Sequence, residues 1–329
     1  MRVRLHWCAL ACAVLAWAMP AASQSLASTA SHNHEWPPLL VEDDPAKMDA
    51  ALALGPQLER GRSARQLLED RRRRERALDA LTPQRAGVVD AYVVSVALDS
   101  DPVFAREARE AGKVLSRRYG AAGHTIVLAG DTGRGAPPLP QGNPESLTLA
   151  IARAAELMDR EHDVLVLYVT THGAPVALAY HDGDEGYGLV SPARLAAIFD
   201  ELGIRNRLLI LSACYSGIFV PSLADAHSVV VTAAASDRTS FGCSAENDWT
   251  FFGDALVNHA LRKPQPLEAA VREARGLIDD WERSNGLTPS NPQIAMGADV
   301  SAWLAPLEAS MPKVASPPAG APATDALKD

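Results

Sequence analysis

Two short motifs carry the residues of this chain that can do chemistry. Cys214 follows the apolar run Leu208–Leu211, and His172 follows a second apolar run at Val164–Val169. Apolar runs of this length predict buried strands. In a parallel sheet, residues just beyond the carboxyl ends of neighbouring strands share one crevice. The pattern therefore predicts a thiol and an imidazole in one site, which are the components of an activated sulfur nucleophile.

The flanking residues favour cysteine chemistry over serine chemistry. A thiolate attacks at neutral pH only with a base or a lowered pKa, and His172 is the candidate base. Gly173 can present its backbone N–H to a developing oxyanion, and the N–H of Cys214 is the candidate second donor. Ser212 and Ser216 lie close by, but neither stands in the Gly-x-Ser-x-Gly elbow of serine hydrolases.

Length and composition set limits on the class of protein. The chain has 329 residues, 47% of them apolar, which fits one α/β domain with extensions. The net charge of −9 argues against a nucleic-acid partner, since nucleic-acid-binding proteins carry a basic excess. Cysteine and histidine show no paired metal-ligand spacing, so we expect no metal site.

Residues 1–23 have the features of a secretory signal peptide. Arg2 and Arg4 precede the apolar segment Leu5–Met19, and Ala21-Ala22-Ser23 supplies small residues for cleavage. The apolar segment is shorter than the roughly twenty residues that span a bilayer. We therefore expect an exported protein, periplasmic or secreted, with no stable membrane span after the signal is removed.

Only two cysteines remain after that cleavage. Cys214 and Cys243 could form a structural disulfide in an oxidising compartment. The place of Cys214 at a strand end favours a free nucleophile instead. Cys243 is then predicted to be a reduced, partly buried thiol.

The chain divides into a signal peptide, an arm, a main domain and a tail. Residues 24–86 form a leader and an arm whose segment Pro45–Leu81 is predicted to be helical, with the Arg71–Arg74 run on a solvated face. The arm either packs on the main domain or is a removable pro-segment. The main domain covers 87–309, and the tail at 310–329 is rich in Pro, Ala and Gly and is predicted to be disordered.

Strands and helices alternate along the main domain. This order predicts a mostly parallel sheet with helices on both faces. The predicted strands are 88–96, 124–128, 164–169, 208–211, 228–233 and 293–296, with a hairpin at 176–190, and the predicted helices are 103–118, 146–160, 192–202, 250–261 and 267–284.

Four ordered motifs resemble peptidase family C13, the legumain-like cysteine peptidases, and in particular its bacterial exported members. The histidine motif is Thr171-His172-Gly173, and the cysteine motif is Ser212-Ala213-Cys214-Tyr215-Ser216-Gly217. The other two motifs are similar to the family's substrate-pocket segments. They are Thr232-Ala233-Ala234 with Thr239-Ser240-Phe241-Gly242-Cys243, and Thr250-Phe251-Phe252-Gly253-Asp254. The resemblance covers Val88 to Leu307.

The resemblance implies a three-layer caspase-like α/β fold, a Cys214/His172 dyad, a peptide or protein substrate and no cofactor. It also implies a pocket that favours Asn or Asp before the cut bond. Legumain-like enzymes carry a Glu two residues before the cysteine that helps to form this pocket, and here that position is Ser212.

The remaining pocket residues are predicted from the same motifs. Asp254 stands at the family position that supplies a hydrogen-bond acceptor, and Thr239 and Ser240 are expected to line the wall. Arg106 is the candidate donor, and a surface salt bridge between Arg106 and Glu110 is the alternative.

We therefore predict an exported cysteine endopeptidase that cleaves after Asn or Asp through a thioester intermediate. Three alternatives stay open at this point. The thioester can be taken by an amine, which would make the protein a transpeptidase. The domain can bind peptides without catalysis, or it can be a structural protein with a Cys214–Cys243 disulfide.

Overall fold

A six-stranded sheet forms the centre of the protein. The computed structural model describes residues 44–130 and 138–327, so the predicted signal peptide at 1–23 lies outside the described residues. The strand order is β10–β9–β8–β4–β2–β3, and only β10 runs antiparallel to its neighbour. The strands are β2 (Ala91–Ala97), β3 (Thr125–Leu128), β4 (Val164–Thr170), β8 (Arg207–Ser212), β9 (Ser228–Thr232) and β10 (Gln293–Met296).

The central strands are buried over their full length. Every residue of β2, β4 and β8 is buried, as expected for parallel strands covered on both faces. This burial explains why these strands could be found in the sequence as continuous apolar runs. The first strand was predicted at 88–96, but it begins at Ala91, because Val88 is exposed and Asp90 turns into the loop to hydrogen-bond Arg85.

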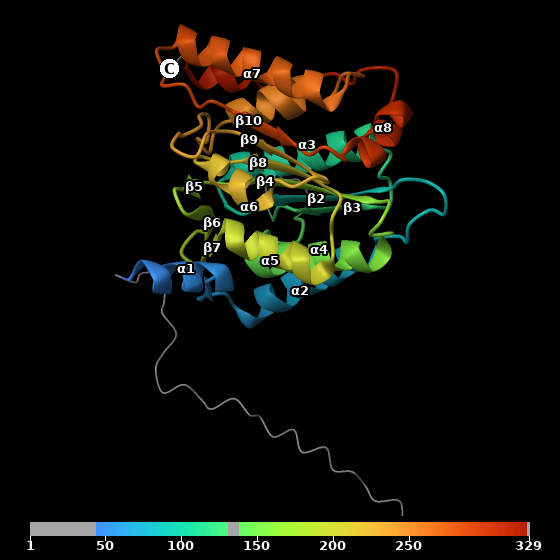
Figure 1. The fold of residues 1–329 in the computed structure, drawn as a ribbon. Helices are drawn as coiled ribbons and strands as arrows, with labels where there is room; N and C mark the ends of the chain where they lie inside the picture. Colours follow the sequence, from blue (N-terminus) through green and yellow to red (C-terminus); the bar gives the residue numbers. More distant parts are fainter. Residues whose placement is uncertain (1–43, 131–137, 328–329) are drawn as a thin grey trace, which may run out of the picture. The chain divides into compact units, whose positions relative to one another are not determined.

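Helices cover both faces of the sheet, so the predicted three-layer α/β architecture with a mostly parallel sheet is confirmed (Figure 1). One face is covered by α3 (Pro102–Arg118), the π-helical segment η2 (Gly253–Ala260), α7 (Leu267–Ser284) and α8 (Ser301–Ser310). The other is covered by α4 (Pro144–Leu157), α5 (Pro192–Leu202), the 3₁₀ turn η1 (Ser216–Phe219) and α6 (Val220–Leu223). Among the described residues, no helix has the length and apolar content needed to cross a membrane.

A second, four-stranded sheet connects the N-terminal arm to the histidine motif. Its order is β1–β7–β6–β5, and all its neighbours are antiparallel. The predicted hairpin is present as β6 (Ala177–Asp182) and β7 (Gly186–Val190). At one edge, β5 (Gly173–Ala174) follows His172 directly, and at the other edge β1 (Gln57–Glu59) comes from the arm.

The arm is not the continuous helix predicted over Pro45–Leu81. It consists of α1 (Pro45–Leu54), β1 and α2 (Ala64–Asp79). The first helix ends at Gly55, which has a φ of 73°, a left-handed conformation that glycine adopts at low cost. Ser63 then starts α2 with a capping box, in which its side chain and that of Gln66 each accept from the other's backbone N–H.

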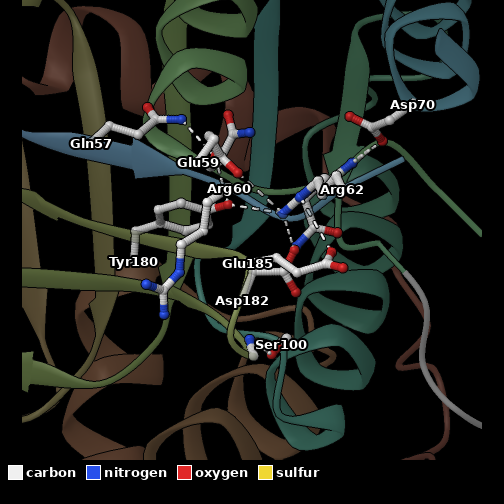
Figure 2. A network of polar contacts seen from close by, with 12 residues as sticks. Gln57, Glu59, Arg60, Arg62, Asp70, Ser100, Tyr180, Asp182 and Glu185 are labelled. Carbon is white, nitrogen blue, oxygen red and sulfur yellow. Dashed lines mark hydrogen bonds and ion pairs between the residues drawn. The ribbon is translucent and has the colours of Figure 1, made fainter. Parts of the chain in front are cut away.

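One arginine fastens this arm to the hairpin. Arg62 forms ion pairs with Glu59, Asp182 and Glu185, and its guanidinium also donates to the hydroxyl of Tyr180 (Figure 2). Asp182 and Glu185 flank the acidic turn of the β6–β7 hairpin. This arginine and its four partners are referred to below as the Arg62 cluster.

The tail predicted to be disordered is packed against η2 instead. Trp249 Nε1 donates to the carbonyl of Ala319 at 2.7 Å, and the N–H of Ala319 donates to Asn258 at 2.8 Å. The short 3₁₀ segment η3 (Ala323–Leu327) follows, and Ala323 is buried. The prediction is wrong because composition does not reveal polar side chains elsewhere in the chain that satisfy the backbone of the tail.

Candidate active site

The strand register brings the two motifs together. In the parallel pair of β4 and β8, Thr170 lies opposite Ser212. His172 and Cys214 each come two residues after this last pair, at the same edge of the sheet. The predicted thiol and imidazole are therefore delivered from neighbouring strand ends.

Gly173 fixes the contact between the two strand ends. A Cβ atom at this position would lie 1.9 Å from the carbonyl oxygen of Cys214, so no other residue fits without moving the backbone. The preceding loop is held in turn by β6, since Ala179 N–H donates to the carbonyl of His172 at 2.9 Å and Thr171 Oγ1 donates to the carbonyl of Ala179 at 2.7 Å. The glycine predicted for an oxyanion hole thus lies directly against the cysteine backbone, and its donor role remains a prediction.

The backbone around the cysteine is strained. Tyr215, the next residue, has a φ of 56°, and its N–H donates to the carbonyl of Arg238 at 2.7 Å. Positive φ values at residues other than glycine store strain and concentrate at functional sites. The turn leaves the Cys214 thiol partly exposed at the start of η1.

Ser240 of the predicted pocket segment lies against the sulfur. Its backbone N–H donates to Cys214 Sγ at 3.2 Å, and its hydroxyl lies 3.7 Å from the same atom. Thr239 is exposed beside it. The structure therefore brings the third motif, the predicted pocket segment, against the Cys214 sulfur.

Both described cysteines, Cys214 and Cys243, are free. This confirms that Cys243 is a reduced, partly buried thiol and does not support the structural disulfide. Burial, followed by the neighbouring Cys214, raises the pKa of the Cys243 thiol. A raised pKa keeps Cys243 protonated and poorly reactive.

Two carboxylates that the sequence reasoning missed lie beside the histidine. Asp101 Oδ2 is 3.7 Å from His172 Nε2, and Asp99 is almost fully buried next to them. Burial raises the pKa of Asp99. The ring of Phe104 packs edge-on against the imidazole, with the centroids 5.0 Å apart. The sequence held a signal for these residues, because they follow the strand that pairs with β4 and must emerge at the same edge.

A third missed carboxylate lies beneath the cysteine strand. Glu107 of α3 is fully buried, and it accepts from Tyr168 Oη at 2.6 Å, Ser212 Oγ at 2.8 Å and Thr250 N–H at 2.9 Å. These four residues are referred to below as the Glu107 cluster. It ties α3, the ends of both motif-bearing strands and the fourth motif together. An acidic residue on the apolar face of a predicted helix, three residues after Phe104, was the available signal.

Two of the predicted pocket residues have other partners. Ser212 is buried and its hydroxyl donates to Glu107, so it does not line an open pocket. Arg106 donates to the backbone carbonyls of Ala245 and Asn247, which places it under the pocket loop. For the alternative salt bridge with Glu110, the structure instead pairs Arg106 Nε with Asp248 Oδ1 at 3.3 Å, and Glu110 with Lys113 and Arg262.

The placement of Asp254 does not support its predicted role in the pocket. Its side chain is fully buried in η2. One carboxylate oxygen accepts from Asn258 Nδ2 at 2.8 Å, and the other accepts from the N–H of Ala323 at 2.8 Å. Asp254 therefore anchors the C-terminal tail, with both oxygens engaged.

Comparison with known proteins agrees with the motifs. Residues 141–297 match the model of the Peptidase C13 family. Among solved structures, the crystal structure of caspase-1 from Spodoptera frugiperda is similar with a TM-score of 0.42 and 17% identity, over 63% of this chain and 85% of that chain. No curated protein sequence matches. The resemblance predicted from the motifs is thus confirmed, and over residues 141–297, which include His172 and Cys214, this chain matches the cysteine peptidases of the Peptidase C13 family.

Proposed function

We propose that the protein is an exported cysteine endopeptidase in which Cys214 is the nucleophile and His172 the general base. The observation that carries this proposal is the shared register of the two residues beyond β4 and β8, with Gly173 packed on the Cys214 carbonyl. Membership of residues 141–297 in a peptidase family supports the same reaction class. No cofactor is required for it.

The proposed reaction has two steps. His172 accepts the thiol proton, and the thiolate attacks the carbonyl carbon of the peptide bond. The oxyanion that forms is stabilised by the N–H groups of Gly173 and Cys214, as proposed from the sequence. The imidazolium then gives its proton to the leaving amine, and the C–N bond breaks to leave a thioester on Cys214. Water, deprotonated by His172, hydrolyses the thioester and restores the thiol.

For the cut bond we propose a preference for Asn, with Asp tolerated. This preference follows from the family resemblance, and two placements support a polar pocket. Ser240 lies against Cys214 Sγ, and Thr239 is exposed beside it. Arg106 supports the same loop from below. A pocket lined with hydroxyl groups should reject apolar side chains, which would leave these groups without partners.

The test of function is a peptide-library digest by the mature protein beside Cys214→Ala and His172→Ala. Each substitution is expected to reduce turnover by several orders of magnitude, because nucleophile and base act as a unit. Cys243→Ala, which removes the other thiol of the described residues, is the matched control and should retain activity. Turnover near the wild-type rate in either dyad variant would contradict the assignment, and cleavage mainly after Lys, Arg or Leu would contradict the pocket.

Export is proposed from residues 1–23 alone, which lie outside the described residues. The expected mature protein begins near Gln24. N-terminal sequencing of protein recovered from the exported fraction tests this, and a retained Leu5–Met19 segment would contradict it.

A further inference from the structure

Three potential metal ligands converge at the histidine end of the site. Asp99, Asp101 and His172 each offer one ligand atom, and these atoms lie within 4.8 Å of one another. They come from two loops at the same sheet edge, the one after β2 and the one after β4. Among the described residues, no other group of three or more His, Cys, Asp or Glu side chains brings its ligand atoms so close together.

The buried member of the group has an unsatisfied oxygen. Asp99 is 3% exposed, and its Oδ1 accepts from the N–H of Asp101 at 2.8 Å. Its Oδ2 is buried and has no hydrogen-bond partner, although His181 Nδ1 lies 3.6 Å away. A buried carboxylate oxygen without a donor is costly unless a cation or a proton compensates it. A cation bound among Asp99, Asp101 and His172, whose ligand atoms lie within 4.8 Å of one another, would compensate the buried carboxylate.

The other two members are accessible to a cation from solvent. The side chains of Asp101 and His172 are 48% and 43% exposed, and their nearest ligand atoms are 3.7 Å apart. Ligands of a tetrahedral Zn²⁺ ion lie roughly 3.4 Å from one another. Small side-chain rotations therefore suffice to close the site, since Asp101 makes no capping hydrogen bond to α3 that would hold it.

We propose that Asp99, Asp101 and His172 form an inhibitory Zn²⁺ site. A mixed set of one imidazole and two carboxylates suits Zn²⁺, whereas Ca²⁺ and Mg²⁺ prefer oxygen ligands alone. The fourth position is open to water or to a thiolate.

Binding of the ion would block the base directly, and this part of the inference rests on the proposed function. A neutral imidazole has one proton and one lone pair. With Zn²⁺ on Nε2 of His172, the proton must stay on Nδ1, so the ring cannot accept the proton of Cys214. Inhibition is therefore expected to be reversible on removal of the ion by a chelator.

The first experiment measures binding without activity. The Cys214→Ala/Cys243→Ala protein lacks both thiols of the described chain, and Zn²⁺ affinity is measured by competition with a chromophoric chelator. One ion is expected to bind, and adding Asp101→Asn should weaken its affinity by roughly 100-fold. Asp99→Asn is the second variant and should act in the same direction. His162→Gln is the control, because exposed His162 pairs with Asp159 at 3.0 Å and, in the part of the chain that the structure describes, belongs to no group of three or more potential metal ligands.

The possible outcomes distinguish failure of the proposed Zn²⁺ site from failure of the proposed peptidase function. Loss of Zn²⁺ binding when both thiols are removed would assign the ion to the cysteines and overturn the proposal. Equal affinity in the Asp101→Asn, Asp99→Asn and His162→Gln proteins would also overturn it. In a second experiment Zn²⁺, but not Ca²⁺, should inhibit the active protein, with activity of each variant normalised to its own metal-free rate. Binding without any peptidase activity would refute the proposed function and leave the metal site standing.

Discussion

The Glu107 cluster and the Arg62 cluster both bind carboxylates, the first with neutral donors and the second with a cation. Glu107 is a single, fully buried carboxylate whose partners are neutral donors, the hydroxyls of Tyr168 and Ser212 and the N–H of Thr250. The Arg62 cluster instead gathers three carboxylates around one guanidinium at the joint between the arm and the hairpin (Figure 2).

This difference predicts different tolerance to change. Neutral donors stabilise a buried carboxylate only while their hydrogen bonds keep the right length and direction, so each partner of Glu107 must stay in place. Several charges at a half-buried joint compensate for one another, and solvent screens them. The Glu107 cluster therefore sets the position of the cysteine strand, and the Arg62 cluster attaches a peripheral segment.

The largest effect is expected from Glu107→Ala. It removes the acceptor that three buried donors share, so the free energy of unfolding should fall by about 3 kcal/mol or more. Because Ser212 lies two residues before Cys214, a shift of this strand end should also lower turnover by roughly 100-fold. Urea denaturation and steady-state kinetics on the best library peptide measure the two effects.

Ser212→Ala is the matched control for Glu107→Ala. It removes one of the three donors and leaves the carboxylate two partners, so both losses should be smaller than in the glutamate variant. Unfolding and turnover near the wild-type values in Glu107→Ala would contradict a positioning role for the cluster.

The two clusters also show how far sequence reasoning can reach. The dyad could be predicted, because Cys214 and His172 each follow an apolar run and parallel strands end at one edge. The partners of Glu107 could not be predicted, since the pattern of an amphipathic helix identifies a buried face and a glutamate on it, but not the donors that this carboxylate meets. Arg62 and Asp182 are 120 residues apart, and no local pattern predicts such a pair.

The wrong predictions from the sequence share one physical cause, which is hydrogen bonds that no local pattern reveals. Asp254 was assigned to the pocket by its motif, whereas its partner Ala323 lies in a tail that composition predicted to be disordered. The arm was predicted as one helix because its leucines recur, although Gly55 and the Ser63 cap divide it. In each case a long-range or capping hydrogen bond decided the structure.

An intermediate effect is expected from Arg62→Ala. Loss of the guanidinium should weaken attachment of the arm by about 2 kcal/mol, the range for hydrogen bonds to charged groups. Faster hydrogen exchange at the β1 amides and faster proteolysis within 44–80 would measure this opening. Arg71→Ala is the control, since the Arg71–Glu75 pair is exposed to solvent, which screens the attraction between its charges. Equal rates of arm opening in both variants would show that the Arg62 cluster does not hold the arm.

The smallest effect concerns the pH dependence of stability at the same joint. Burial raises the pKa of Asp182, and the charge of Arg62 opposes that rise. The folded state therefore binds this proton at a higher pH than the unfolded state, whose pKa is near 3.8. The sign follows from linkage: the contribution of Asp182 to stability increases as the pH falls through the folded-state pKa, and it is constant below the unfolded value.

Asp182→Asn should remove the pH dependence of stability that Asp182 causes. Arg62→Ala should extend that dependence to higher pH, because the cation no longer lowers the pKa of Asp182. Urea midpoints measured from neutral pH down to about 4 would follow both changes. Asp163 provides the internal reference. Burial raises its pKa as well, but its oxygens accept from the backbone N–H groups of Asp90 and Asp159, and Arg62 is not among the groups that shift this pKa. The contribution of Asp163 to the dependence of the urea midpoint on pH should be the same in the wild type and in Arg62→Ala. If the two curves of midpoint against pH superposed at every pH, Arg62 and Asp182 would not be coupled.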